Sequence, residues 1–136
     1  MSLRSIPSIV LALIIYNAVV FVSGGTEVLG QSLFELPMLS GGHWSFKVGD
    51  AIILLTLFLL FAELIKSTYT STSSLVDHGL SMVLFVVCLI EFLLAPLAAT
   101  STFFLITVAT AIDVIAGFTI GIRVARRDLA IGGVEH

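Results

Sequence analysis

The chain has 136 residues, of which 58% are hydrophobic and 11% are charged, and its formal net charge is −3. Soluble domains carry about 25% charged residues, and a small soluble fold buries only about two-thirds of the surface of its unfolded chain. With a mean hydropathy of +1.17, this composition excludes an ordinary water-soluble domain and predicts lipid as the solvent. The dispersed charge offers no basic face for nucleic acid, and the single cysteine, Cys88, excludes a disulfide framework.

Four apolar segments approach the length that a membrane-spanning helix needs, which is roughly 20 residues. They cover residues 6–22, 48–65, 75–94 and 102–124. A signal peptide is the alternative for the first segment, but Tyr16 and Asn17 interrupt its apolar run and no A-x-A-type cleavage site follows. We therefore predict an all-α integral membrane protein, a single domain over residues 1–136 that forms a four-transmembrane-helix bundle.

The longest connection, residues 23–47, is polar with an apolar centre, and Pro37 and two glycine pairs exclude another span. We predict a short interfacial amphipathic helix within it, from about Glu27 to Leu36. The aromatic residues of this loop suit the level of the lipid headgroups, and they are the candidate lipid contacts: Trp44, Phe34 and Phe46.

The other two connections are short. Residues 67–74 are rich in hydroxyl groups, which compete for backbone hydrogen bonds and favour turns. Pro96 closes the third segment, and Thr100 or Ser101 is a suitable N-cap for the fourth.

The distribution of Lys and Arg predicts the orientation, because these residues concentrate in cytoplasmic connections. One side of the predicted bundle has only Lys47, and the other has five such residues: Arg4, Lys66, Arg123, Arg126 and Arg127. We expect a multi-pass protein of the cell inner (cytoplasmic) membrane with both termini in the cytoplasm.

Ionisable side chains within membrane spans are costly and are treated first as functional candidates. The candidates for a polar seam or a transport path are Glu91, Asp113, Glu63, Asp50 and Asn17. At about 1.5 Å per residue, the four carboxyl groups step across the bilayer from Asp50 to Glu63. Carboxyl groups withdrawn from water can exchange protons near neutrality, which would suit a proton or cation path. The alternative is that they form hydrogen-bonded contacts between helices, or reach water near the helix ends.

Helical spacing places these polar residues on shared faces. Asp77, Ser81, Cys88 and Glu91 lie on one face of the third segment. Thr110, Asp113, Gly117 and Gly121 lie on one face of the fourth, and its two glycines form a GxxxG pattern that permits close helix packing. We expect these faces to meet inside the bundle or at an oligomer interface.

Residues 61–66, with the sequence FAELIK, end the second of four spans in a short chain, and this combination resembles the phosphate-starvation-inducible family of small inner-membrane proteins. The loop and the third span, including residues 75–78 (LVDH) and Glu91-Phe92, look more like uncharacterised four-helix bacterial inner-membrane proteins. Neither resemblance implies a particular functional residue.

Three hypotheses for the function follow. The first is a small non-enzymatic protein, either a homo-oligomer or an accessory subunit of a larger membrane complex. The second is a proton- or cation-coupled transporter or channel that uses the intramembrane carboxylates. The third and weakest is lipid or quinone binding under the outer loop. The sequence has no nucleophile–base pattern, phosphate loop or HExxH motif, so we expect no catalytic residue, no metal site and no cofactor, and membrane lipids as partners.

Overall fold

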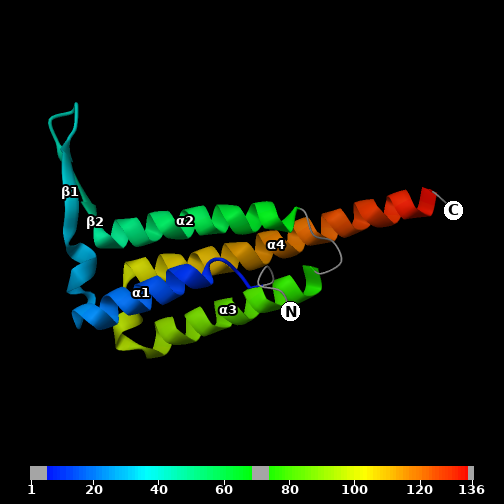
Figure 1. Cartoon of the computed structure of the whole chain (residues 1–136), viewed down its shortest axis with the longest axis horizontal. Helices are drawn as coiled ribbons and strands as arrows, with labels where there is room; N and C mark the ends of the chain where they lie inside the picture. The colour runs from blue at the N-terminus through cyan, green and yellow to red at the C-terminus, as the bar shows by residue number, and fades with distance from the viewer. Residues whose placement is uncertain (1–5, 69–73, 135–136) are drawn as a thin grey trace.

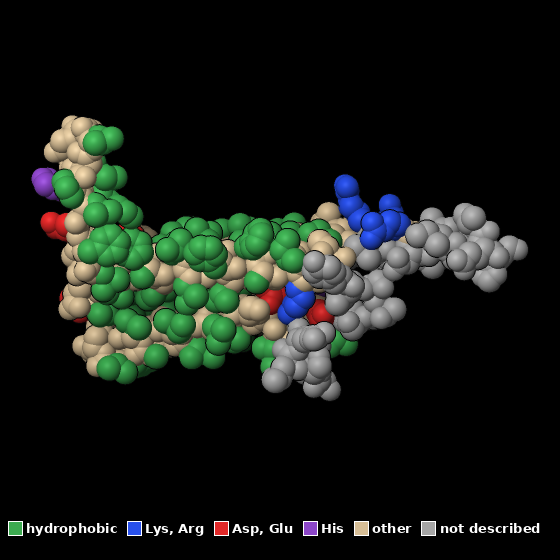
Figure 2. Space-filling view, turned by 45° about the horizontal axis from the view of Figure 1, so that its top comes forward, with side chains coloured by type: hydrophobic (Ala, Val, Ile, Leu, Met, Phe, Trp, Pro, Cys, Tyr) green, Lys and Arg blue, Asp and Glu red, His purple; other side chains and the backbone are tan. Residues whose placement is uncertain are grey.

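The computed structural model describes residues 6–68 and 74–134. Its helices run in alternating directions along one axis (Figure 1), and they are α1 (Val10–Ser23), α2 (Val48–Ser67), α3 (Ser74–Leu94) and α4 (Ser101–Val134). The start of α2 and the start of α4 lie at one end of the bundle, which we call the hairpin end. The three exposed arginines of α4, Arg123, Arg126 and Arg127, lie beyond the opposite end, which we call the arginine end (Figure 2).

Three helices are long and apolar enough to cross a membrane: α2, α3 over Val76–Leu94, and α4 over Ser101–Ile120. Large apolar side chains cover much of the outside of the bundle (Figure 2). This arrangement suits lipid rather than water, because a soluble protein would turn these side chains inward. The helices therefore point to a membrane protein.

The predicted spans agree closely with two of the helices. The expected segments 48–65 and 75–94 correspond to α2 and α3 within two residues at each end. The segment 6–22 is helical only from Val10, so α1 has 14 residues and a length of about 21 Å. The segment 102–124 is part of a longer helix, because α4 continues to Val134 beyond its apolar part.

Helix α4 is central and packs against α2 on one side and α3 on the other. Its contact with α2 is tight near the hairpin end, where a Cβ added to Gly49 would lie 2.9 Å from the Thr102 hydroxyl oxygen. Only a residue without a side chain allows the two helices to approach this closely. Helix α1 runs along the same axis as the other helices and covers the half of the bundle nearest the hairpin end (Figure 1).

The prediction of an amphipathic helix from Glu27 to Leu36 is wrong. Thr26–Gly30 forms a single 3₁₀ turn (η2), and the chain then makes a two-stranded antiparallel hairpin of β1 (Ser32–Pro37) and β2 (His43–Lys47). The turn between the strands uses Gly41 at φ 92°, a conformation that favours glycine. Apolar side chains recur at every second position in these strands, which is the period of a strand rather than of a helix.

The side chain of Tyr16 is fully buried and joins α1 to the connection between α3 and α4. Its hydroxyl donates a hydrogen bond to the Leu97 carbonyl at 2.7 Å and lies 2.7 Å from the Thr100 hydroxyl. The Thr100 oxygen in turn accepts a bond from the Phe103 N–H at 3.1 Å, so Thr100 caps α4 as predicted. The ring of Tyr16 packs edge-on against that of Phe103, with centroids 5.0 Å apart.

Replacing Tyr16 by Phe keeps the ring but removes the hydroxyl, and leaves the Leu97 carbonyl without this donor. We expect a loss of about 1 kcal/mol in the free energy of unfolding, the usual scale for one such bond in a helical membrane protein. Unfolding in mixed micelles with increasing SDS, followed by circular dichroism, measures this loss. Phe21→Leu at the exposed end of α1 is the control and should stay within about 0.5 kcal/mol of the parent. Equal stability of Tyr16→Phe and the parent would contradict the assignment.

Candidate functional site

Glu63 joins the end of α2 to the start of α1. Its carboxylate accepts a hydrogen bond from the Ser8 N–H, which belongs to the turn that precedes α1. Lys66 lies 3.2 Å from the same carboxylate oxygen, and its ammonium group also donates to the Ile6 carbonyl at 3.4 Å. The first N–H groups of a helix lack partners within the helix and carry partial positive charge, so a carboxylate from a neighbouring helix satisfies and stabilises this end.

Asp113 of α4 lies beside this contact. It is 3% exposed, its charge interacts with those of Glu63 and Lys66, and the Ser81 hydroxyl of α3 neighbours its carboxyl group. The proximity follows from helix geometry: Asp113 is about 18 Å along α4 from its start, and Glu63 is about 22 Å along α2, which begins at the same end. The two carboxyl groups are therefore at nearly the same depth and do not form successive steps.

His78 of α3 completes this group of side chains. It is 7% exposed, and its ring lies against that of Phe118 with centroids 4.8 Å apart. The absence of a side chain at Gly117 makes room for it, because an added Cβ would lie 3.0 Å from the His78 Cε1 and Nδ1 atoms. Within the described part of the chain, the His78 Nε2 atom and the Asp77 Oδ1 atom are buried without a hydrogen-bond partner.

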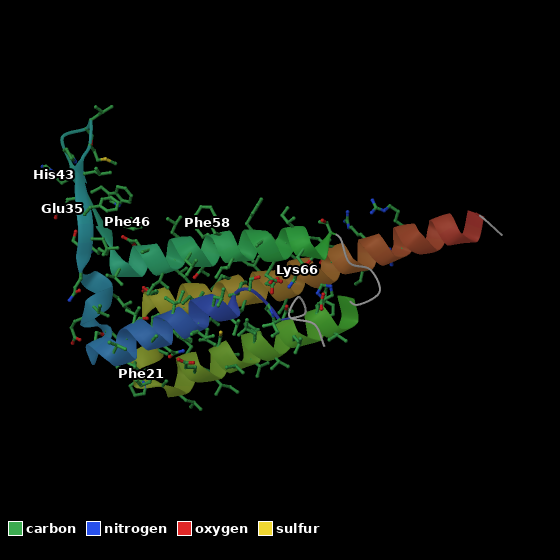
Figure 3. The ribbon with its side chains drawn as sticks, viewed as in Figure 1. Phe21, Glu35, His43, Phe46, Phe58 and Lys66 are labelled. Carbon is green, nitrogen blue, oxygen red and sulfur yellow. The ribbon has the colours of Figure 1, made fainter. Side chains whose placement is uncertain are left out.

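The buried Ser67 hydroxyl donates a hydrogen bond to the Glu63 carbonyl at 3.0 Å. We call these side chains the polar cluster, which consists of Glu63, Lys66, Ser67, His78, Ser81 and Asp113. Each of the three long helices contributes at least one ionisable group to it: Glu63 from α2, His78 from α3 and Asp113 from α4. Figure 3 shows Lys66 toward the arginine end of the bundle. This arrangement can hold helices together by charge-assisted hydrogen bonds, and it can also accept or release a proton.

Glu91 and Asn17 form a separate contact between α3 and α1. The Asn17 amide donates to the Glu91 carboxyl group at 3.4 Å and to the Leu13 carbonyl at 3.0 Å. The predicted polar faces of α3 and α4 do meet, since Cys88 neighbours Thr110 and Ser81 neighbours Asp113. The contact between Glu91 and Asn17, however, is nearer the hairpin end than the polar cluster is.

Asp50 has no contact with these groups among the interactions of the described residues. It is exposed in the first turn of α2, where its carboxylate accepts a hydrogen bond from the Lys47 N–H at 3.1 Å. This hydrogen bond is one of the two that form a capping box: the side chain at the third helical position accepts from the backbone N–H of the N-cap residue. An acidic residue in the first turn of an apolar run, as Asp50 is here, is a sequence signal for that role.

The aromatic residues expected at the lipid interface are together on the hairpin. The ring of Phe34 stacks on that of Phe46 with centroids 4.9 Å apart, and Trp44 packs edge-on against both, at 6.1 Å from Phe34 and 5.6 Å from Phe46. Gly117 faces His78 within the same chain, as described above, whereas the surroundings of Gly121 lie outside the described residues.

An apolar groove of about 210 Å³ runs between α2 and α4 on the outside of the bundle. Its lining is Ile53, Thr56, Leu57, Leu60, Leu105, Val108, Ala109 and Ile112. The one hydroxyl group there, that of Thr56, is already bonded to the Ile52 carbonyl at 2.8 Å. The groove is therefore suited to apolar side chains or lipid tails.

Sequence reasoning missed the role of Tyr16 and assigned no site role to His78 or Lys66. Separations of 3, 7 and 3 residues place His78, Ser81, Cys88 and Glu91 on one face of a helix and could have placed His78 inside. No such signal marks Tyr16. Among residues 6–68 and 74–134, no three His, Cys, Asp or Glu side chains are arranged to hold a metal ion.

The comparisons with known proteins give no family. No protein-family model matches the chain, and no match was found among curated proteins or among solved structures. The resemblances that the sequence suggests stay predictions.

Substitutions at two glycines test the packing at the polar cluster. Gly79 of α3 is exposed with open space around it, so Gly79→Ala should stabilise the protein by about 0.5–1 kcal/mol through helix propensity. Gly117→Leu must displace the His78 ring and should cost about 1–3 kcal/mol. SDS titration of the two variants and the parent measures both effects, and a Gly117→Leu protein as stable as the parent would contradict the proposed packing.

Proposed function

We propose that this protein is a small non-enzymatic, multi-pass membrane protein that functions by assembling with other membrane helices, first with copies of itself. The apolar groove between α2 and α4 carries this proposal. In lipid, helices associate through close packing against such surfaces, because the hydrophobic effect does not drive them together. Glu63 and Asp113 are buried, and Glu63 accepts a hydrogen bond from the Ser8 N–H. The carboxyl group of Asp113 interacts with groups of α2 and α3, so both residues are suited to a structural role.

We place all four helices in the cell inner membrane. The 14 residues of α1 cover about 21 Å, less than the roughly 30 Å of a hydrocarbon core. The preceding residues Ile6–Ile9 lengthen this segment. Glu63 and Lys66 form hydrogen bonds with backbone groups of these residues, which lipid could not do. A short first helix is compatible with spanning the membrane because side chains of α2 form hydrogen bonds with the backbone groups that precede α1.

The arginine end faces the cytoplasm in this proposal. Among the described residues, Lys66, Arg123, Arg126 and Arg127 lie toward that end, whereas the hairpin end has Lys47. Positive residues are retained on the cytoplasmic side during insertion. Both termini are then cytoplasmic, and the hairpin is on the outer side.

Self-assembly is tested by truncating side chains at the groove. Leu57→Ala with Ile112→Ala removes two exposed groove residues, and should weaken association between labelled copies by about tenfold, or about 1.4 kcal/mol. Energy transfer between donor- and acceptor-labelled copies in liposomes, over a range of protein-to-lipid ratios, measures the association.

Val83→Ala with Ile90→Ala is the matched control, because these residues are similarly exposed on α3, away from the groove. Equal weakening by both pairs would show that the groove is not the contact surface. A parent protein that stays monomeric at every ratio would refute self-assembly itself.

Proton or cation transport is the second candidate, and the convergence of Glu63, His78 and Asp113 from three helices favours it. Two neighbouring carboxyl groups beside a histidine can exchange protons, and intramembrane groups of this kind mark proton relays.

Asp113→Asn keeps the size of the side chain and removes its ionisation, so it should abolish any proton or cation flux into liposomes. Glu35→Gln, on the exposed hairpin, is the control and should leave the flux unchanged. Flux in the parent that Asp113→Asn leaves intact would exclude a role for the polar cluster in transport.

A further inference from the structure

The hairpin has two chemically different faces. The strand register pairs Phe34 with Phe46 and Leu36 with Trp44. Residues paired across two strands point to the same side, so these four side chains form one surface, which we call the aromatic face. The alternate pairs, Glu35 with Ser45 and Pro37 with His43, form the opposite side.

One face of the hairpin points toward the helices, and the other points away from them. Figure 3 shows Phe46 on the side of the hairpin that overlooks the outer wall of α2, where Phe58 also lies, and it shows Glu35 and His43 on the side away from the helices. The strands run across the direction of the helices (Figure 1). The hairpin thus overhangs the exposed apolar wall of α2 (Figure 3).

The position and reach of the hairpin match the surface of a bilayer. The strand β2 ends at Lys47 and α2 begins at Val48, so the hairpin is level with the start of a helix that is apolar enough to span. The six residues of β1 extend about 20 Å sideways. Phe34, Leu36 and Trp44 remain 42–47% exposed, so the bundle leaves the aromatic face uncovered.

We propose that the aromatic face binds the lipid bilayer itself, at the boundary between headgroups and acyl chains on the hairpin end. Its surface is continuous with the lipid-facing wall of α2, and its strands lie in the plane that the headgroups would occupy. Trp and other aromatic side chains suit this level, where an apolar ring meets water. Glu35, His43 and Ser45 then face the aqueous side, and the hairpin fixes the depth at which α2 enters the membrane.

This inference rests on the membrane-spanning arrangement proposed above. Trp44 is the single tryptophan of the chain, so its fluorescence reports on the aromatic face alone. The full-length protein is reconstituted into phosphatidylcholine liposomes that contain lipids brominated either near the headgroup or near the chain end, and acrylamide is the aqueous quencher. We expect Trp44 to lie about 5–10 Å below the headgroups. Lipids brominated near the headgroup should then reduce its emission roughly twofold, and lipids brominated near the chain end should reduce it less. Acrylamide should cause little quenching.

Variants assign the signal to the aromatic face. Phe34→Ser with Phe46→Ser removes two of its rings and should make Trp44 accessible to acrylamide and insensitive to brominated lipid. Glu35→Gln with His43→Gln changes the opposite side and should leave both readouts unchanged.

The other outcomes are distinguishable. A protein that fails to enter liposomes refutes the membrane-spanning arrangement. An inserted protein whose Trp44 is quenched by acrylamide and not by lipid overturns the hairpin inference alone. Shielding of Trp44 from both quenchers also overturns it, because a protein surface, such as a second copy, would then cover the aromatic face.

Discussion

The contact between Glu63 and the turn that precedes α1 determines how the bundle closes at its arginine end. One carboxylate accepts the Ser8 N–H and pairs with Lys66, whose ammonium group also reaches the Ile6 carbonyl. In lipid these backbone groups would have no other partner, and leaving them unpaired would cost several kcal/mol. The short first helix is therefore tolerated because α2 supplies the polar groups that its start requires.

The need to pair polar groups within the protein also explains the interior of the bundle. Polar groups on α3 and α4 point toward one another, and Gly117 leaves space for the His78 ring. At the hairpin end Tyr16 uses its hydroxyl to join α1 to the connection between α3 and α4. Contacts between helices at both ends fix the bundle while its outer surface remains apolar, which leaves that surface available to lipid and to other helices. The proposed assembly role is more directly related to this division than the alternative of transport is.

The hairpin has strands that run across the direction of the helices, which alternate along one axis (Figure 1). Its aromatic face and the outer wall of α2 meet at a corner (Figure 3), and the groove between α2 and α4 is formed by one of these same helices. In the proposed arrangement, the hairpin controls the depth of α2 in the bilayer. It thereby controls the level at which the groove meets a neighbouring helix.

The sequence alone determined the long helices, because an apolar run bounded by Lys or Ser has no stable alternative in lipid, and it predicted α2 and α3 almost to the residue. It also placed the polar residues of α3 and α4 on single faces, since helical spacing is a local property. It could not reveal that Glu63 and Asp113 are neighbours, because their separation depends on how α2 and α4 align. The hairpin was mistaken for a helix although its apolar residues alternate with the period of a strand. Only the tertiary structure shows the pairing of Phe34 with Phe46 and of Leu36 with Trp44, because it joins residues on different strands. Likewise, only tertiary structure gave Tyr16 its role, since the partners of its hydroxyl lie more than 80 residues further along the chain.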